Sequence, residues 1–155
     1  SPTGAAIEKA TSEMQIGPDW GANMQICDMI NHRSDGVQSG VKALKRRLKN
    51  DNPKVVTLAL LLCEACVKNC GFPLHAAVEQ SLLADVAGLT DGRRGWEVRE
   101  KALALIQQWA AAFQGDRALG GFTETYSFLR RKGIQFPQGV QSAPVFTPPA
   151  TRVPA

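Results

Sequence analysis

Trp20 and Met24 are the residues whose types and spacing point most directly to a chemistry, and that chemistry is the recognition of an apolar surface. Residues 19–30 have the pattern of a short helix, in which each residue turns by about 100°. On that helix Trp20, Met24 and Cys27 share one arc. The opposite arc holds a second apolar set, Ala22, Ile26, Met29 and Ile30. Because a short helix packed on one layer has one core to face, the Trp20 arc either meets another element of the chain or binds a partner.

Sulfur chemistry is the second possibility that the sequence raises. The chain has four cysteines, Cys27, Cys63, Cys66 and Cys70. The last three have helical spacing on one side of an apolar helix, which favours small buried thiols in a reducing, cytosolic compartment. A zinc site is the alternative, but it needs a fourth ligand, and neither His32 nor His75 has the spacing of one. We therefore expect no metal and no cofactor.

Basic residues form a cluster on one face of the expected helix over 36–49 and at the start of the next helix. Its members are Lys42, Lys45, Arg46, Arg47, Lys49 and Lys54. One interpretation is a solvated helix face, and the other is a contact with anionic phosphoinositide headgroups at a membrane surface. The net charge of +4 is too small to argue for nucleic acid, and no aromatic residue lies among these cations to stack on bases.

Catalytic arrangements are not apparent in the sequence. There is no glycine-rich phosphate loop, no metal-ligand set and no pairing of a nucleophile with a base. His32 and His75 are isolated, which favours capping or core roles. Glu64, within an apolar helix, is expected to be hydrogen-bonded or at an edge. The sequence thus indicates a binding domain and not an enzyme.

The elements that must position these residues are all predicted to be helices. Their expected ranges are 5–14, 20–31, 36–49, 53–69, 73–79, 81–89, 96–113 and 119–132. Segment 53–69 is apolar around nearly its whole girth, so it should be the buried centre. Eight helices with such a centre predict an all-α layered superhelix. No apolar run reaches the ~20 residues of a membrane span, and the first residues lack the features of a signal peptide.

The composition changes after Pro137. Five of the nine prolines lie in the last nineteen residues, where Arg152 is the one charged side chain. We predict a helical domain over 5–137 and an extended Pro-rich linker or tail over 138–155, of which Val145-Phe146 could lie on a neighbouring surface. Further chain is expected to follow the tail.

Several motifs, in this order, resemble those of a VHS domain, over roughly residues 5–137. They are Ile7–Glu13, Asp19-Trp20, Ile26-Cys27-Asp28, Lys45–Leu48, Asn52–Val55, Glu64–Gly71, Val98–Lys101 and Gly133–Pro137. The run Glu-Ala-Cys-Val-Lys-Asn-Cys-Gly is the most specific. Within the family the chain is most similar to the Tom-one-like and STAM-like adaptors.

The resemblance implies a right-handed superhelix of eight helices, similar also to ENTH domains, and no catalysis. It implies a cytoplasmic adaptor, peripheral to endosomal membranes, that sorts ubiquitinated membrane cargo. It further implies ubiquitin binding through Trp20 and Met24, with Asn23 at the polar rim. Met24 departs from the usual Leu or Ile, but a flexible thioether of similar volume should serve.

Two other departures lie away from that site: Leu74, where an aromatic residue is common, and the Gly92–Trp96 loop, with its unexpected Trp96. Some relatives bind acidic-dileucine signals between the sixth and eighth helices. Tyr126, Arg130 and Arg131 of the eighth helix are the candidates here, although that groove cannot be matched residue by residue. Phosphoinositide binding and a purely structural scaffold remain further alternatives.

Overall fold

Residues 1–138 form eight α-helices and no strand in the computed structural model, which describes these residues of the 155. The prediction of an all-α fold is confirmed. The helices are α1 (Pro2–Ala10), α2 (Trp20–His32), α3 (Gly36–Leu48), α4 (Pro53–Asn69), α5 (Phe72–Ser81), α6 (Leu83–Gly88), α7 (Trp96–Ala112) and α8 (Gly120–Arg131), with short 3₁₀ turns η1 (Leu89–Asp91) and η2 (Arg117–Leu119). None of these described helices combines the length and the apolarity that crossing a bilayer requires.

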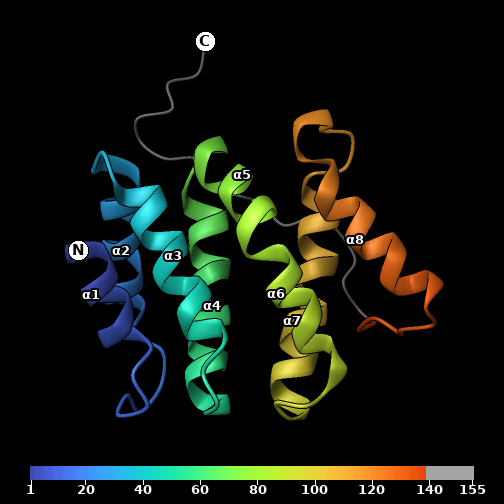
Figure 1. Cartoon of the computed structure of the whole chain (residues 1–155), viewed down its shortest axis with the longest axis horizontal. Coiled ribbons are helices and arrows are strands. Elements are labelled where there is room, and N and C mark those ends of the chain that lie inside the picture. The colour runs from blue at the N-terminus through green and yellow to red at the C-terminus, as the bar shows by residue number, and fades with distance from the viewer. Residues whose placement is uncertain (139–155) are drawn as a thin grey trace.

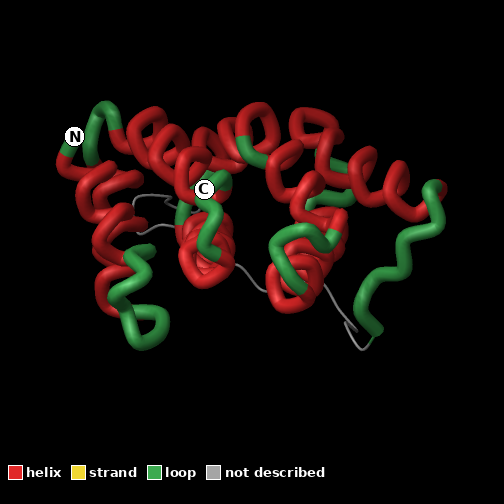
Figure 2. Tube along the Cα trace, turned by 60° about the horizontal axis from the view of Figure 1, so that its bottom comes forward, coloured by secondary structure: helices red, strands yellow, loops and turns green. Residues whose placement is uncertain are grey.

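The helices are stacked in two layers (Figures 1 and 2). One layer contains α2, α4 and α7, and the other contains α3, α5, α6 and α8, while α1 packs on α2 and α3 at one end. Helix α8 lies at the opposite end of the molecule and packs chiefly on α7. The first and last helices are thus far apart, and their exposed faces are available to different partners.

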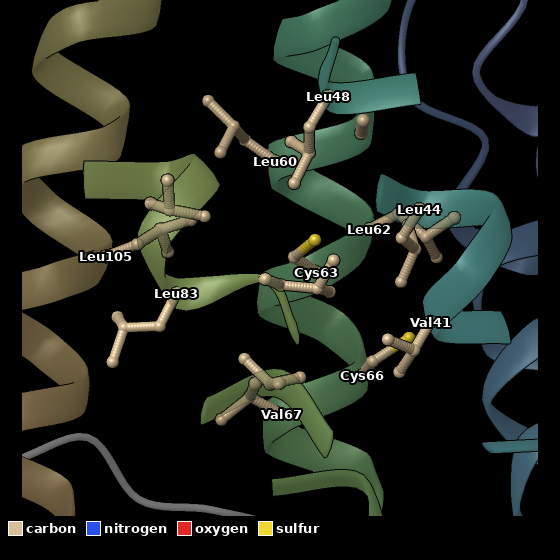
Figure 3. Close-up of a cluster of buried hydrophobic side chains, with 14 of the residues drawn as sticks. Val41, Leu44, Leu48, Leu60, Leu62, Cys63, Cys66, Val67, Leu83 and Leu105 are labelled. Atoms are coloured by element: carbon tan, nitrogen blue, oxygen red, sulfur yellow. The ribbon is translucent and has the colours of Figure 1, made fainter. Parts of the chain in front are cut away.

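Helix α4 is the centre of this stack, as its apolar girth predicts. It spans the predicted residues, and it begins at Pro53 because Asn52 accepts a hydrogen bond from the Lys54 amide (3.0 Å) and Pro53 occupies the first turn. It packs on α2, α3, α5 and α7. Figure 3 shows Leu60, Leu62 and Val67 of α4 meeting leucines of α3, α6 and α7.

The bounds of α1 differ from the prediction of residues 5–14. The helix begins at Pro2 because the Ser1 hydroxyl accepts a hydrogen bond from the Gly4 amide (3.0 Å). It ends at Ala10, where the Thr11 hydroxyl donates to the Ile7 carbonyl (2.7 Å) and closes the last turn. The other helices match their predicted ranges to within one or two residues.

The segment after α8 returns to the core. Ile134 and Phe136 are partly buried against it, and the Phe136 ring packs on Tyr126 with ring centroids 4.6 Å apart. The expected tail over 138–155, including Val145-Phe146, lies outside the described residues except for Gln138.

Candidate functional site

Trp20 and Met24 form an exposed apolar patch on the first turns of α2, which we call the Trp20–Met24 patch. The exposed fraction is 59% for Trp20 and 45% for Met24. Asp19 caps the helix by accepting a hydrogen bond from the Ala22 amide (3.0 Å), which fixes Trp20 as the first helical residue. The two side chains therefore lie one turn apart on an ordered helix.

The buried face of α2 adjoins the Trp20–Met24 patch and includes residues outside the predicted apolar arc. Asn23, Ile26, Cys27 and Ile30 are all buried, at an i, i+3, i+4, i+7 spacing that defines one core-facing stripe. The expectation that Asn23 forms the polar rim is wrong, because its exposed fraction is 3%.

Cys27 lies on the same arc of α2 as Trp20 and Met24 but is buried, so this part of the arc meets another element of the chain. Its exposed fraction is 1%, and the Cys70 thiol beside α4 approaches its carbonyl at 3.8 Å. The reason is that α4 packs on this side of α2, a contact that periodicity cannot foresee. The exposed neighbours of the Trp20–Met24 patch on α2 are Gly21, Gln25 and Asp28.

Sequence reasoning missed an apolar hollow in the segment that leads into α2. Its volume is about 590 Å³, and it lies between the loop before α2, the first turns of α4 and the start of α7. Ile16 and Trp96 line it and are exposed by 104% and 72%. The unusual Trp96 at the start of α7 is the available signal, but no local pattern indicates that Ile16 lies near it.

The six basic residues separate into two groups. Lys45 donates to Asp85 (2.7 Å) and to the Ser81 carbonyl, Arg47 donates to the Thr11 hydroxyl (2.9 Å), and Lys54 donates to the Glu13 carbonyl (2.9 Å). These three side chains link α3 and α4 to other elements. Lys42, Arg46 and Lys49 are exposed on one face of α3 and its C-cap, and their side chains make no hydrogen bond or ion pair with another described residue.

The thiols and histidines occupy structural positions. All four cysteines are buried and unpaired, and burial raises the pKa of Cys63 to about 12. His75 is buried and donates from Nε2 to the Val67 carbonyl (2.8 Å), whereas His32 donates from Nδ1 to the Asp28 carbonyl (2.8 Å). Within residues 1–138 no group of three or more His, Cys, Asp or Glu side chains is arranged to hold a metal ion.

Glu64 and the α8 residues also have defined surroundings. Lys101 of α7 donates to Glu64 at 2.8 Å, so this carboxylate is hydrogen-bonded, as predicted. Tyr126 is half-buried, and Arg130 lies over its ring at 5.7 Å from the centroid. A shallow hollow beside Arg130 and Arg131 is lined by residues of α8, without a contribution from α6.

The chain is similar to several curated trafficking proteins. It is 44% identical to TOM1-like protein 9 of Arabidopsis thaliana over 96% of this chain and 22% of that protein. It is 40% identical to human TOM1-like protein 2 (96% and 31%) and to the mouse Target of Myb1 membrane trafficking protein (97% and 32%). The chain thus spans between a fifth and a third of the length of these relatives.

A solved structure and a family model agree with these relatives. The crystal structure of the VHS and FYVE tandem domains of Hrs, described as a protein involved in membrane trafficking and signal transduction, superposes with a TM-score of 0.81 at 31% identity. The match covers 92% of this chain and 67% of that one. The model of the VHS domain matches residues 1–133. By fold and by sequence, the chain belongs to the VHS domain family.

Proposed function

We propose that this VHS domain binds ubiquitin through the Trp20–Met24 patch and serves as an adaptor that sorts ubiquitinated membrane cargo. The observation that carries the proposal is the joint exposure of an indole and a thioether one turn apart on an ordered helix. Large apolar side chains held in water on a rigid element are typical of protein-binding sites. Their role is recognition rather than catalysis.

The size of the patch implies weak binding. Covering the exposed part of Trp20 contributes on the order of 2 kcal/mol at most, and much of this is offset by the entropy lost on association. A single site of this kind therefore needs help from several ubiquitins or from a second binding module in the same protein. The relatives, which are three to five times longer than this chain, have room for such modules.

The setting we propose is the cytoplasmic face of endosomal membranes. Its support is that the mouse relative is named a membrane trafficking protein and that the Hrs structure is described in the same terms. A domain that binds ubiquitin attached to membrane cargo acts peripherally at that surface.

Trp20→Ala tests the proposal. In a titration of the labelled domain with ubiquitin, followed by amide chemical shifts, the wild-type chain should show shifts centred on α2, and the variant should show none. Trp96→Ala is the matched control, because it removes a second exposed indole from another helix, and it should bind as the wild type does. Unchanged binding by a folded Trp20→Ala variant would refute the proposal.

Phosphoinositide binding by α3 is a second candidate. The observation that favours it is that Lys42, Arg46 and Lys49 project from one exposed face without an acidic partner among the described residues. Three cations on one face can contact an anionic headgroup. The candidate is narrower than the six-residue cluster, since Lys45, Arg47 and Lys54 already hold partners within the domain.

A further inference from the structure

The end of α8 carries three consecutive cations without an ionic partner among the described residues, of which Arg130 lies over the Tyr126 ring. Arg130, Arg131 and Lys132 are exposed, and none makes an ion pair or a side-chain hydrogen bond with another described residue. Glu124 is the one acidic residue between Gly120 and Gln138, so this segment has a net charge of +2 (three cations and one anion). The three charges are therefore available to an anionic partner.

An aromatic side chain lies among these cations. Phe128 is 51% exposed, one helical turn before Lys132, whose ammonium group lies over the ring at 5.4 Å from its centroid. Cations near a helix C-terminus are favourable because they oppose the negative end of the helix dipole. The dipole explains neither the exposed Phe128 nor the absence of hydrogen bonds from these side chains to the terminal carbonyls.

The surface at this end is shallow and belongs to a single helix. The hollow beside the cations is lined by Ser127, Arg130 and Arg131, all on α8. A peptide ligand would ordinarily be held between two walls, and here the second wall is missing from that lining. A broad anionic surface that can accept three cations and one aromatic ring at once fits better.

We propose that the C-terminal end of α8 binds an anionic lipid bilayer. Arg130, Arg131 and Lys132 contact lipid phosphate and carboxylate groups, and Phe128 enters the boundary between headgroups and acyl chains. Cations combined with an exposed aromatic residue on a helix are the composition of interfacial membrane-binding elements. The proposal does not depend on ubiquitin binding or on the α3 residues.

The position of α8 determines which other surfaces stay accessible when α8 contacts a bilayer. The Trp20–Met24 patch is at the far end of the stack from α8, with α4 and α7 between them (Figure 1). A domain attached to a bilayer through α8 would keep α2 free for a protein partner. Membrane contact and protein recognition could then occur in the same molecule at the same time.

Vesicle sedimentation of the 155-residue chain tests the proposal. Binding to vesicles of equimolar phosphatidylcholine and phosphatidylserine should exceed binding to phosphatidylcholine alone and should fall with added salt. Each cation removed should weaken binding about fivefold, so Arg131→Glu/Lys132→Glu should lose at least ~25-fold. Phe128→Ala should weaken binding without changing its salt dependence.

Lys9→Glu/Arg117→Glu is the matched control, because it makes the same change in net charge at exposed positions on α1 and η2. It should keep most of the binding, and all variants should retain the wild-type circular dichroism. Three results would overturn the proposal: an equal loss in the control, a loss in Lys42→Glu/Arg46→Glu but not in the α8 variants, or α8 amide shifts with an acidic peptide but none with vesicles.

Discussion

Met24 loses more side-chain freedom than most apolar residues when a partner covers it. A methionine fixed in one conformation loses up to ~2 kcal/mol of rotamer entropy, against roughly 0.5–1 kcal/mol for leucine. Met24 is already half covered by its own domain, so only part of this difference remains. We predict that Met24→Leu tightens ubiquitin binding by about two- to fivefold at an unchanged contact area.

Ubiquitin titration by isothermal calorimetry or by amide shifts measures this effect. Met14→Leu is the matched control, because Met14 is 85% exposed in the loop before α2 and is not part of the Trp20–Met24 patch. Its binding should equal that of the wild type. Weaker binding by Met24→Leu would mean that the partner needs the flexibility of the thioether and not merely its volume.

Gly36 determines how closely α3 can fold back against α2. A Cβ atom at this position would lie 2.5 Å from the Met29 carbonyl oxygen and 2.7 Å from the Ile30 Cα, both of which are backbone atoms of α2. Backbone cannot move aside as a flexible side chain can, so the two helices would have to separate. We predict that Gly36→Ala lowers the free energy of unfolding by about 2–3 kcal/mol.

Denaturant titration measures that loss as a shift of the midpoint. Gly88→Ala is the control, since a Cβ there meets no atom within 4 Å and the residue ends α6 in a helical conformation. It should be neutral or stabilising by a few tenths of a kcal/mol. Equal stability of the Gly36 and Gly88 variants would show that the contact between α2 and α3 is not tight.

Short-range sequence signals predict the ends of some helices but not of others. The start of α4 follows from Asn52 and Pro53, residue types that favour the N-terminus of a helix. The end of α1 depends on the Thr11 hydroxyl, which also accepts a hydrogen bond from Arg47, 36 residues away. An interaction at that separation has no signature in the local sequence.

The candidate sites likewise depend on contacts between residues that are far apart in the sequence. The exposure of Trp20 and Met24 is one of the two outcomes that the helical pattern of α2 left open. The burial of Asn23 depends on which neighbours α2 acquires. Likewise, Lys45 is not among the unpaired basic residues, because its ammonium group pairs with Asp85 of α6 at 2.7 Å.

At the scale of the whole molecule, α4 and α8 have different places in the stack. Leu62 of α4 is fully buried where α4 meets its neighbours, whereas Leu129 is buried between α8 and the adjoining elements at one end. Replacing either leucine with alanine should cost about 3 kcal/mol of local packing. The set of helices that lose stability should differ between the two variants, because a helix in a stacked fold directly affects only the helices that it contacts.

Native-state hydrogen exchange distinguishes the two cases, since it measures the opening free energy of each helix separately. We predict that Leu62→Ala lowers the protection of α4 together with that of α2, α3, α5 and α7, because α4 contacts these four helices. Leu129→Ala should lower protection in α8 and in the adjoining part of α7, while α1, α2 and α3 keep theirs. If Leu129→Ala reduced protection equally in every helix, the domain would open as one unit. A local opening of α8 at a membrane would then also disturb the Trp20–Met24 patch.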